Sequence, residues 1–216
     1  MNENDKIEQN IEQKQNIEQN IETILTECDA MLSGHFLLSS GNHSNRYFQC
    51  ARLLQFPDKS AAVFSVIAQK LRDAKLAGKV DFDVVAGPAI GGIIPAYELA
   101  RALGIPAIFT ERGDDARMAL RRGFDSIVKS GTKIIIAEDV ITTGKSTLEA
   151  AACLTALGAK ITASSCIVDR RQDGENPFSW DVFSALKQSA VLYAPDECPL
   201  CREGKLPAVK PGSRKI

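Results

Sequence analysis

The sequence is built around one run, which reads Lys133-Ile134-Ile135-Ile136-Ala137-Glu138-Asp139-Val140-Ile141-Thr142-Thr143-Gly144-Lys145-Ser146-Thr147. Its first part is apolar and β-branched, which is typical of a strand buried on both faces of a sheet. Two adjacent carboxylates follow, and then a short loop of Thr, Gly, Lys and Ser. Residues 148–157 are rich in Ala and Leu and predict a helix. The run therefore predicts a strand, a polar loop and a helix in succession.

The polar loop has the composition of an anion-binding site. Loop N–H groups and the positive end of a helix dipole converge at one point, and hydroxyl groups add hydrogen-bond donors. With a phosphate bound there, Glu138 and Asp139 would face whatever is attached to it, and a ribose suits two carboxylates. An ordinary strand-to-helix turn without a ligand is the alternative.

The end of the loop, Gly144-Lys145-Ser146, looks like the end of a nucleotide-triphosphate P-loop. That motif requires a glycine five residues before its Gly-Lys pair, and this position is Asp139. The P-loop interpretation therefore fails. The two-acid version instead resembles the phosphoribosyl-diphosphate signature of the type I phosphoribosyltransferases.

Length and composition favour one globular domain with an appendage. The chain has 216 residues, of which 44% are hydrophobic and 25% charged. A net charge of −1 gives no electrostatic case for binding nucleic acid or a membrane surface. The sequence has no apolar run of about 18 residues, and its N-terminal segment is too polar for a secretory signal. We therefore expect a cytoplasmic protein. The six scattered cysteines are expected to be free thiols.

Residues 1–26 are expected to form a polar, low-complexity helical extension, in which Ile-Glu-Gln-Asn occurs at 7–10 and again at 17–20. Its isoleucines recur at near-helical spacing and form a narrow apolar stripe. The stripe could pack on the domain, pair with a partner subunit or fray. Loose packing is the favoured interpretation for residues 1–16.

Residues 33–50 predict a β-hairpin around a turn of Ser, Gly and Asn, and they contain both histidines, His35 and His43. No carboxylate or cysteine lies at ligand spacing from them, so we expect polar turn residues rather than a metal pair. The tail contains Cys198-Pro199-Leu200-Cys201. A closed zinc site there needs two more ligands, which a symmetric dimer could supply. A redox pair and a reduced structural turn are alternatives, and the turn is favoured.

A second turn of the anion-binding type lies at Gly87–Gly92, between a short strand at 83–86 and a helix at about 94–103. Its glycines allow a ligand to approach the backbone closely, but their spacing does not match the dinucleotide-binding fingerprint. A strand at 160–168 ends in Asp169-Arg170-Arg171, where an arginine is well placed to bind an anionic substrate. The alternation of strands and helices predicts an α/β fold with a mainly parallel sheet flanked by helices.

The segment 111–124 is strongly charged. It contains four arginines, Arg112, Arg117, Arg121 and Arg122. They could bind a polyanion such as pyrophosphate, or they could belong to a solvated charged hairpin. The two interpretations carry equal weight.

Taken together, the hairpin, the Gly87 turn, the arginine-rich loop, Glu138–Ser146 and the strand end at Arg170 resemble the orotate phosphoribosyltransferases. The tail, with its Cys-Pro-Leu-Cys, is similar to one bacterial and archaeal branch. The resemblance covers residues 27–216 and implies a single domain of the type I phosphoribosyltransferase fold, with a small hood made by the N-terminal hairpin and the C-terminal segment.

The resemblance implies an enzyme of pyrimidine synthesis that transfers ribose 5-phosphate from phosphoribosyl diphosphate to orotate. It implies Mg²⁺ as cofactor, held mainly by substrate and water, and a homodimer that shares a mobile loop between subunits. The implied contacts to phosphoribosyl diphosphate are Glu138, Asp139, Val140, Ile141, Thr142, Thr143, Gly144, Lys145 and Ser146. The implied contacts to orotate are Thr142, Arg170, Tyr47 and Phe48.

The chain departs from the family pattern at several positions. The hairpin has Ser39, and the Gly87 turn has Ile90-Gly91, where many members have a lysine. The mobile loop has no Lys or His between 111 and 123, so its cations would have to come from the four arginines, and the sequence does not say which of them. We take Arg112 and Arg117, with Asp139, as the expected catalytic residues. Two other functions remain open, a purine or uracil phosphoribosyltransferase and a non-catalytic phosphoribosyl-diphosphate sensor. A sensor that regulates transcription would need an element that binds nucleic acid, and the sequence shows no helix-turn-helix or basic stripe.

Overall fold

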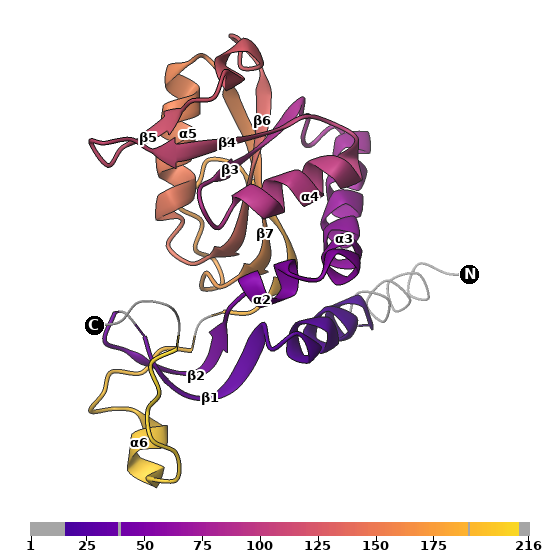
Figure 1. Cartoon of the computed structure of the whole chain (residues 1–216). Helices are drawn as coiled ribbons and strands as arrows, with labels where there is room; N and C mark the ends of the chain where they lie inside the picture. Colours follow the sequence, from indigo (N-terminus) through magenta and orange to yellow (C-terminus); the bar gives the residue numbers. More distant parts are fainter. Residues whose placement is uncertain (1–15, 39, 190, 212–216) are drawn as a thin grey trace. The chain divides into compact units, whose positions relative to one another are not determined.

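The computed structural model describes residues 16–38, 40–189 and 191–211. The chain divides into two compact units (Figure 1). The larger unit is Leu54–Ser189, and the smaller unit combines Met1–Leu53 with Ala190–Ile216. The smaller unit thus joins the N-terminal hairpin to the C-terminal segment, the two parts of the hood expected from the sequence.

The larger unit contains a six-stranded sheet in the order β5-β4-β3-β6-β7-β8. Every neighbouring pair is parallel except β4 and β5, which are antiparallel. The strands are β3 (Val84–Pro88), β4 (Ala107–Arg112), β5 (Met118–Leu120), β6 (Lys133–Ile141), β7 (Lys160–Asp169) and β8 (Asp181–Lys187). The prediction of a mainly parallel sheet is confirmed.

Helices cover both faces of this sheet (Figure 1). Helices α3 (Pro57–Leu76) and α4 (Ile93–Leu103) contact one another on one face, and α5 (Lys145–Ala156) packs on the other. A short 3-10 turn, η1 (Phe124–Ser126), precedes β6. None of the described helices combines the length and apolar character that crossing a membrane requires.

The central strand β6 explains why the fold is organised as it is. Ile134, Ile135 and Ile136 have no exposed surface, as expected for a β-branched strand covered on both faces. On the α5 face, Ile134 and Ile136 pack with Ala150 and Leu154. This burial positions the two carboxylates that follow at the carboxyl end of the strand.

The smaller unit is built on a two-stranded antiparallel sheet of β1 (Met31–Leu37) and β2 (His43–Phe48). A helix at 16–27 precedes it, with Ile21 and Leu25 buried, and the predicted role of residues 1–15 lies outside the described residues. Helix α2 (Ala51–Leu54) follows the hairpin, and α6 (Pro199–Glu203) lies in the C-terminal segment.

The interpretation of His35 and His43 as polar turn residues is wrong. Both lie on strands, and only 4% and 8% of their surfaces are exposed. The turn itself falls between residues 37 and 43, so the histidines flank it and point away from solvent. Sequence composition around the turn could not reveal which side chains the fold buries.

Strand β8 was not predicted from the sequence, and β5 was anticipated only under the charged-hairpin interpretation. Strand β5 is short and lies within the charged segment, where its apolar residues give little periodic signal. Strand β8 follows an irregular loop and has a mixed composition. Helix α5 begins at Lys145 and not near 148, since the polar residues Lys145 and Ser146 form its first turn.

Candidate active site

The carboxyl ends of the parallel strands meet at one edge of the sheet, where ligands of open α/β sheets bind. Strand β3 ends at Pro88, β4 at Arg112, β6 at Ile141 and β7 at Asp169. The structure therefore brings four predicted features to this edge: the Gly87–Gly92 turn, Arg112, the 138–146 segment and Arg170.

The phosphate-loop geometry predicted from the sequence is present. Gly144 adopts a left-handed conformation with φ of 75° and precedes the first residue of α5. No side chain of the described chain caps the N-terminus of α5, so its first N–H groups remain available to an anion. The neighbouring hydroxyl and amine side chains are exposed: Thr142, Thr143, Lys145 and Ser146.

An aromatic side chain that the sequence did not single out supports this loop. A Cβ atom placed on Gly144 would lie 2.4 Å from Cζ of Phe178. The Phe178 ring stacks on Trp180 at 5.4 Å between centroids, and the Trp180 indole donates a 2.8 Å hydrogen bond to Ser164 Oγ. Only glycine fits at position 144, both for its conformation and for the contact with the ring.

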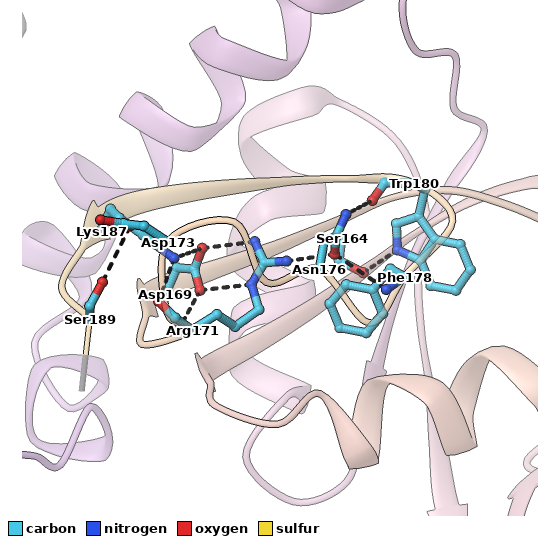
Figure 2. Close-up of polar contacts among 9 residues, drawn as sticks. All are labelled: Ser164, Asp169, Arg171, Asp173, Asn176, Phe178, Trp180, Lys187 and Ser189. Atoms are coloured by element: carbon cyan, nitrogen blue, oxygen red, sulfur yellow. Dashed lines mark hydrogen bonds and ion pairs between the residues drawn. The ribbon is translucent and has the colours of Figure 1, made fainter. Parts of the chain in front are cut away.

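Phe178 is in turn held by a buried polar network (Figure 2). The Arg171 guanidinium forms two hydrogen bonds to the Asp169 carboxylate, at 2.9 and 2.8 Å, and lies 5.6 Å from the Phe178 ring centroid. Arg171 Nη1 also donates to Asn176 Oδ1, which accepts from the Phe178 amide. Lys187 Nζ lies 3.2 Å from Asp169 Oδ2. The network fixes the loop that follows β7.

Burial raises the pKa of Asp169, but the hydrogen bonds from Arg171 and Lys187 outweigh burial. The pKa of the carboxyl therefore lies below its ordinary value, and Asp169 stays charged at neutral pH. This matters for the site because the charged pair is what orders the segment around Phe178.

The two carboxylates of β6 differ in environment. Glu138 is 8% exposed, and burial, with a smaller effect of the Asp139 charge, raises its pKa to about 8. Asp139 is partly exposed, and its Oδ1 accepts a 2.7 Å hydrogen bond from the Val140 amide. Burial also raises the pKa of Asp139. Because successive side chains of a strand leave opposite faces, the two carboxyl groups start from different sides of β6.

The Gly87–Gly92 turn lies directly against the second carboxylate. A Cβ atom on Gly91 would lie 3.3 Å from Asp139 Oδ1, and one on Gly92 would lie 2.7 Å from the Ala137 carbonyl oxygen. The Ala89–Ile90 peptide bond in this turn is cis. The turn after β3 and the acids of β6 therefore belong to one site, as the two anion-type loops predicted.

Arg170 and Thr142 are also neighbours. The Arg170 amide donates a 2.8 Å hydrogen bond to the carbonyl of Ile141, the residue before Thr142. The Arg170 side chain is 9% exposed, and burial lowers the pKa of its guanidinium. The other two predicted orotate contacts belong to the smaller unit. Tyr47 donates a hydrogen bond to Gln49, and Phe48 is buried.

The arginine-rich segment forms a hairpin of β4 and β5, and most of its charges are paired. Arg112 donates to the Ala116 carbonyl and pairs with Glu149 on α5. Arg122 pairs with Glu111 at 2.9 Å. Arg117 is largely exposed and lies 3.8 Å from Asp115. The charged-hairpin interpretation describes this conformation, and a contact with pyrophosphate stays a prediction.

The donor set at the edge suits a magnesium ion, which prefers oxygen ligands and keeps several waters. Asp139 offers a partly exposed carboxylate beside the Gly91 backbone. Glu138 is a poorer ligand at neutral pH because its pKa of about 8 leaves it mostly protonated.

Comparison with known proteins agrees with this geometry. Residues 51–197 match the phosphoribosyl transferase domain family. The chain belongs to this family. It is 47% identical over 192 residues to an orotate phosphoribosyltransferase of Carboxydothermus hydrogenoformans. The aligned residues make up 89% of this chain and 96% of that relative. The family recognised from the sequence is therefore confirmed, and the branch suggested by the Cys-Pro-Leu-Cys tail stays a prediction.

Solved structures confirm the type I phosphoribosyltransferase fold. Orotate phosphoribosyltransferase from Aeropyrum pernix matches with a TM-score of 0.60 and 23% identity, over 76% of this chain and 92% of that chain. Adenine phosphoribosyltransferase from Thermoanaerobacter pseudethanolicus matches with a TM-score of 0.50 and 17% identity, over 66% of this chain and 88% of that one. Because enzymes named for different bases share the fold, the fold alone does not choose the base.

Proposed function

We propose that this protein is an orotate phosphoribosyltransferase of pyrimidine biosynthesis. It transfers ribose 5-phosphate from phosphoribosyl diphosphate to N1 of orotate and releases pyrophosphate and orotidine 5′-monophosphate. The observation that carries the proposal is the 47% identity to an enzyme of this name across 89% of the chain. The loop at Gly144 and the acids of β6 supply matching chemistry.

The 5′-phosphate binds in the loop from Thr142 to Ser146. The N-terminus of α5 supplies N–H donors and the positive end of its dipole, and the exposed hydroxyls and Lys145 complete the anion site. The backbone of Val140 and Ile141 leads the chain into this loop. Gly144 permits the tight approach because it carries no side chain.

The ribose hydroxyls are held by Glu138 and Asp139. Asp139 accepts hydrogen bonds as a carboxylate, whereas Glu138, with a pKa of about 8, is mostly protonated at neutral pH and can also donate one. The transition state is oxocarbenium-like, so catalysis consists mainly of positioning and charge stabilisation. Asp139 holds the ribose while its C1 carbon moves from pyrophosphate to the base.

Orotate carries a carboxylate, and Arg170 is the arginine assigned to it. A guanidinium binds a carboxylate through two parallel hydrogen bonds, and burial strengthens such a pair once it has formed. Thr142, beside Arg170 at the strand ends, adds a hydroxyl. The assignments of Tyr47 and Phe48 to the base remain predictions from the resemblance.

The leaving pyrophosphate is assigned to Arg112, Arg117 and the Gly87–Gly92 turn. Arg112 pairs with Glu149, so it would exchange that partner for the polyanion. Mg²⁺, when bound, neutralises charge on the pyrophosphate oxygens. We further propose a homodimer that shares the arginine-rich hairpin between subunits, and a cytoplasmic location. Size-exclusion chromatography with light scattering tests the dimer.

The base is tested by product chromatography of reactions that contain phosphoribosyl diphosphate, Mg²⁺ and one base. Orotate, uracil, adenine, hypoxanthine and guanine are compared at equal concentration. We expect a nucleotide product from orotate alone. A product from a purine or from uracil would keep the family and overturn the substrate, whereas binding of phosphoribosyl diphosphate without any product would favour a sensor.

A further inference from the structure

Four metal-binding side chains meet within the smaller unit. They are His35, His43, Cys198 and Cys201, and one ligand atom of each lies within 4.8 Å of the others. His35 and Cys198 are separated by 163 positions in the sequence. Only folding brings these residues together, and the favoured interpretation of the cysteine pair as a plain turn did not anticipate it.

We propose that these four residues form a structural zinc site. Two thiolates and two imidazoles are a set that closed tetrahedral zinc sites use, and soft sulfur ligands select zinc over Mg²⁺. From the sequence alone, a symmetric dimer could have supplied the two missing ligands, but in the structure both come from the same chain.

Three of the sulfur–nitrogen distances are close to those of a tetrahedral site. His35 Nε2 lies 3.6 Å from the Sγ atoms of both Cys198 and Cys201, and His43 Nδ1 lies 3.3 Å from Cys201 Sγ. Zinc–sulfur and zinc–nitrogen bonds of about 2.3 and 2.0–2.1 Å, at tetrahedral angles, separate sulfur from nitrogen by roughly 3.5 Å. His35 Nε2 and His43 Nδ1 are 2.8 Å apart, and they need to move only slightly further apart for both to bind the same ion.

The outer contact of His35 sets the tautomer that a metal requires. Its Nδ1 lies 2.9 Å from the Leu206 carbonyl oxygen, which can only accept a hydrogen bond. Nδ1 therefore carries the proton, and Nε2 keeps a lone pair on the side where His43 Nδ1 and both sulfur atoms lie within 3.6 Å. Metal-bound histidines usually donate their other N–H to a carbonyl or carboxylate in this way.

The backbone ties the cysteine segment to the hairpin on both sides. Before the cysteines, His43 and Tyr193 exchange two hydrogen bonds, at 2.8 and 2.9 Å. After them, Val209 donates to the His35 carbonyl at 2.9 Å and accepts from Leu37 at the same distance. The ligands thus stand where the C-terminal segment meets the two strands.

The C-terminal segment has little else to order it. Within the described residues 191–211, only Cys198 is fully buried, and α6 has no buried core of its own. Both cysteines are free thiols and not a disulfide. Small units with few buried apolar side chains commonly depend on a metal or a disulfide, and a zinc ion would supply that link.

Metal content is the test. The whole chain is produced in zinc-containing growth medium and purified without chelator. Its zinc content is then measured by inductively coupled plasma mass spectrometry. We expect about one zinc per chain for the wild type and for Cys153→Ser, a control cysteine on α5. We expect a loss of at least tenfold in Cys198→Ser and in His35→Gln.

A second measurement uses only the wild-type protein, so it tests the site even if a variant fails to fold. Zinc is removed from the wild type with a chelator, and Co²⁺ is added as a probe. We expect the intense visible bands of tetrahedral cobalt, with sulfur-to-cobalt charge transfer in the near ultraviolet. Wild-type protein that contains no zinc and takes up neither Zn²⁺ nor Co²⁺ would overturn the proposal.

A count of thiols separates the redox alternative. Denatured protein should show all six cysteines of the chain as free thiols once the metal is chelated. Only four reactive thiols, with no metal, would indicate a Cys198–Cys201 disulfide and contradict a zinc site. Because every readout is independent of catalysis, this test and the test of the proposed transferase activity can fail separately.

Discussion

The Phe178 ring lies against Gly144, so close that a Cβ atom at position 144 would approach Cζ of the ring to 2.4 Å. Gly144 immediately precedes α5, the helix whose N-terminus is the proposed anion site, and Phe178 belongs to the loop after β7. This contact connects the phosphate loop to the Asp169–Arg171 network. The shape of the proposed phosphate site therefore depends on a segment to which we assign no phosphate contact.

The first prediction concerns Gly144→Ala. The variant should lose roughly 2–4 kcal/mol of stability and raise KM for phosphoribosyl diphosphate at least tenfold, because the methyl group meets Phe178 and φ is 75°. Gly174→Ala is the matched control, since its φ is 83° but no atom lies within 4 Å of the added carbon. The control should lose only about 1 kcal/mol, with normal KM. Equal effects of both substitutions would show that the Phe178 contact is unimportant.

The second prediction concerns Arg171→Ala. Removing the guanidinium leaves the buried Asp169 carboxylate with Lys187 and the backbone N–H of residue 171, so we expect a loss of roughly 2–4 kcal/mol in urea unfolding. Arg101→Ala removes an exposed ion pair with Glu98 and should leave stability almost unchanged. Binding of phosphoribosyl diphosphate should weaken in Arg171→Ala alone. A variant as stable as the control would refute a structural role of this network.

The third prediction is a pH dependence of stability that comes from Glu138. Its folded pKa of about 8 exceeds the ordinary 4.5, so the folded state binds more protons between these values. The free energy of unfolding should therefore fall as pH rises from about 4.5 to 8. Glu138→Gln should remove this slope and be the more stable protein at pH 9, by roughly 2–5 kcal/mol.

Thermal unfolding without substrates, from pH 4.5 to 9, measures the effect of Glu138. The difference between wild type and Glu138→Gln cancels the titration of all groups that the two proteins share. Parallel curves at every pH would mean that Glu138 titrates normally and is not buried as described.

Much of the larger unit could be predicted from the sequence because local patterns carry it. The β-branched run at 134–136 predicts a buried strand, and the polar residues after it predict an anion loop at the helix that follows. These features depend on neighbours in the sequence. The packing of Gly91 against Asp139 agrees with the expectation that two such turns share one edge of a sheet.

Contacts between distant segments could not be predicted in the same way. Phe178 lies in a loop without periodicity, and nothing in the sequence relates it to Gly144. His35 and His43 lack a cysteine at ligand spacing, so rules that depend on spacing rejected a metal there. Cys198 and Cys201 reach them only because the C-terminal segment returns along β1 and β2.

The fourth prediction concerns Arg170→Ala. If the guanidinium binds the orotate carboxylate, kcat/KM for orotate should fall by about two orders of magnitude, with little change in KM for phosphoribosyl diphosphate. Arg170→Lys should recover part of the loss, because it restores the charge without the paired hydrogen bonds. Steady-state kinetics with each substrate varied in turn measures both effects. An equal loss for both substrates would point to a general role in folding.

The most direct test of the proposed activity is the loss of orotate absorbance near its ultraviolet maximum, with purified full-length protein, phosphoribosyl diphosphate and Mg²⁺. We predict steady turnover by the wild type and a rate at least 100-fold lower for Asp139→Asn, which keeps the shape of the side chain but removes its charge. Wild-type protein that leaves orotate unchanged, while remaining folded and able to bind phosphoribosyl diphosphate, would contradict the assignment.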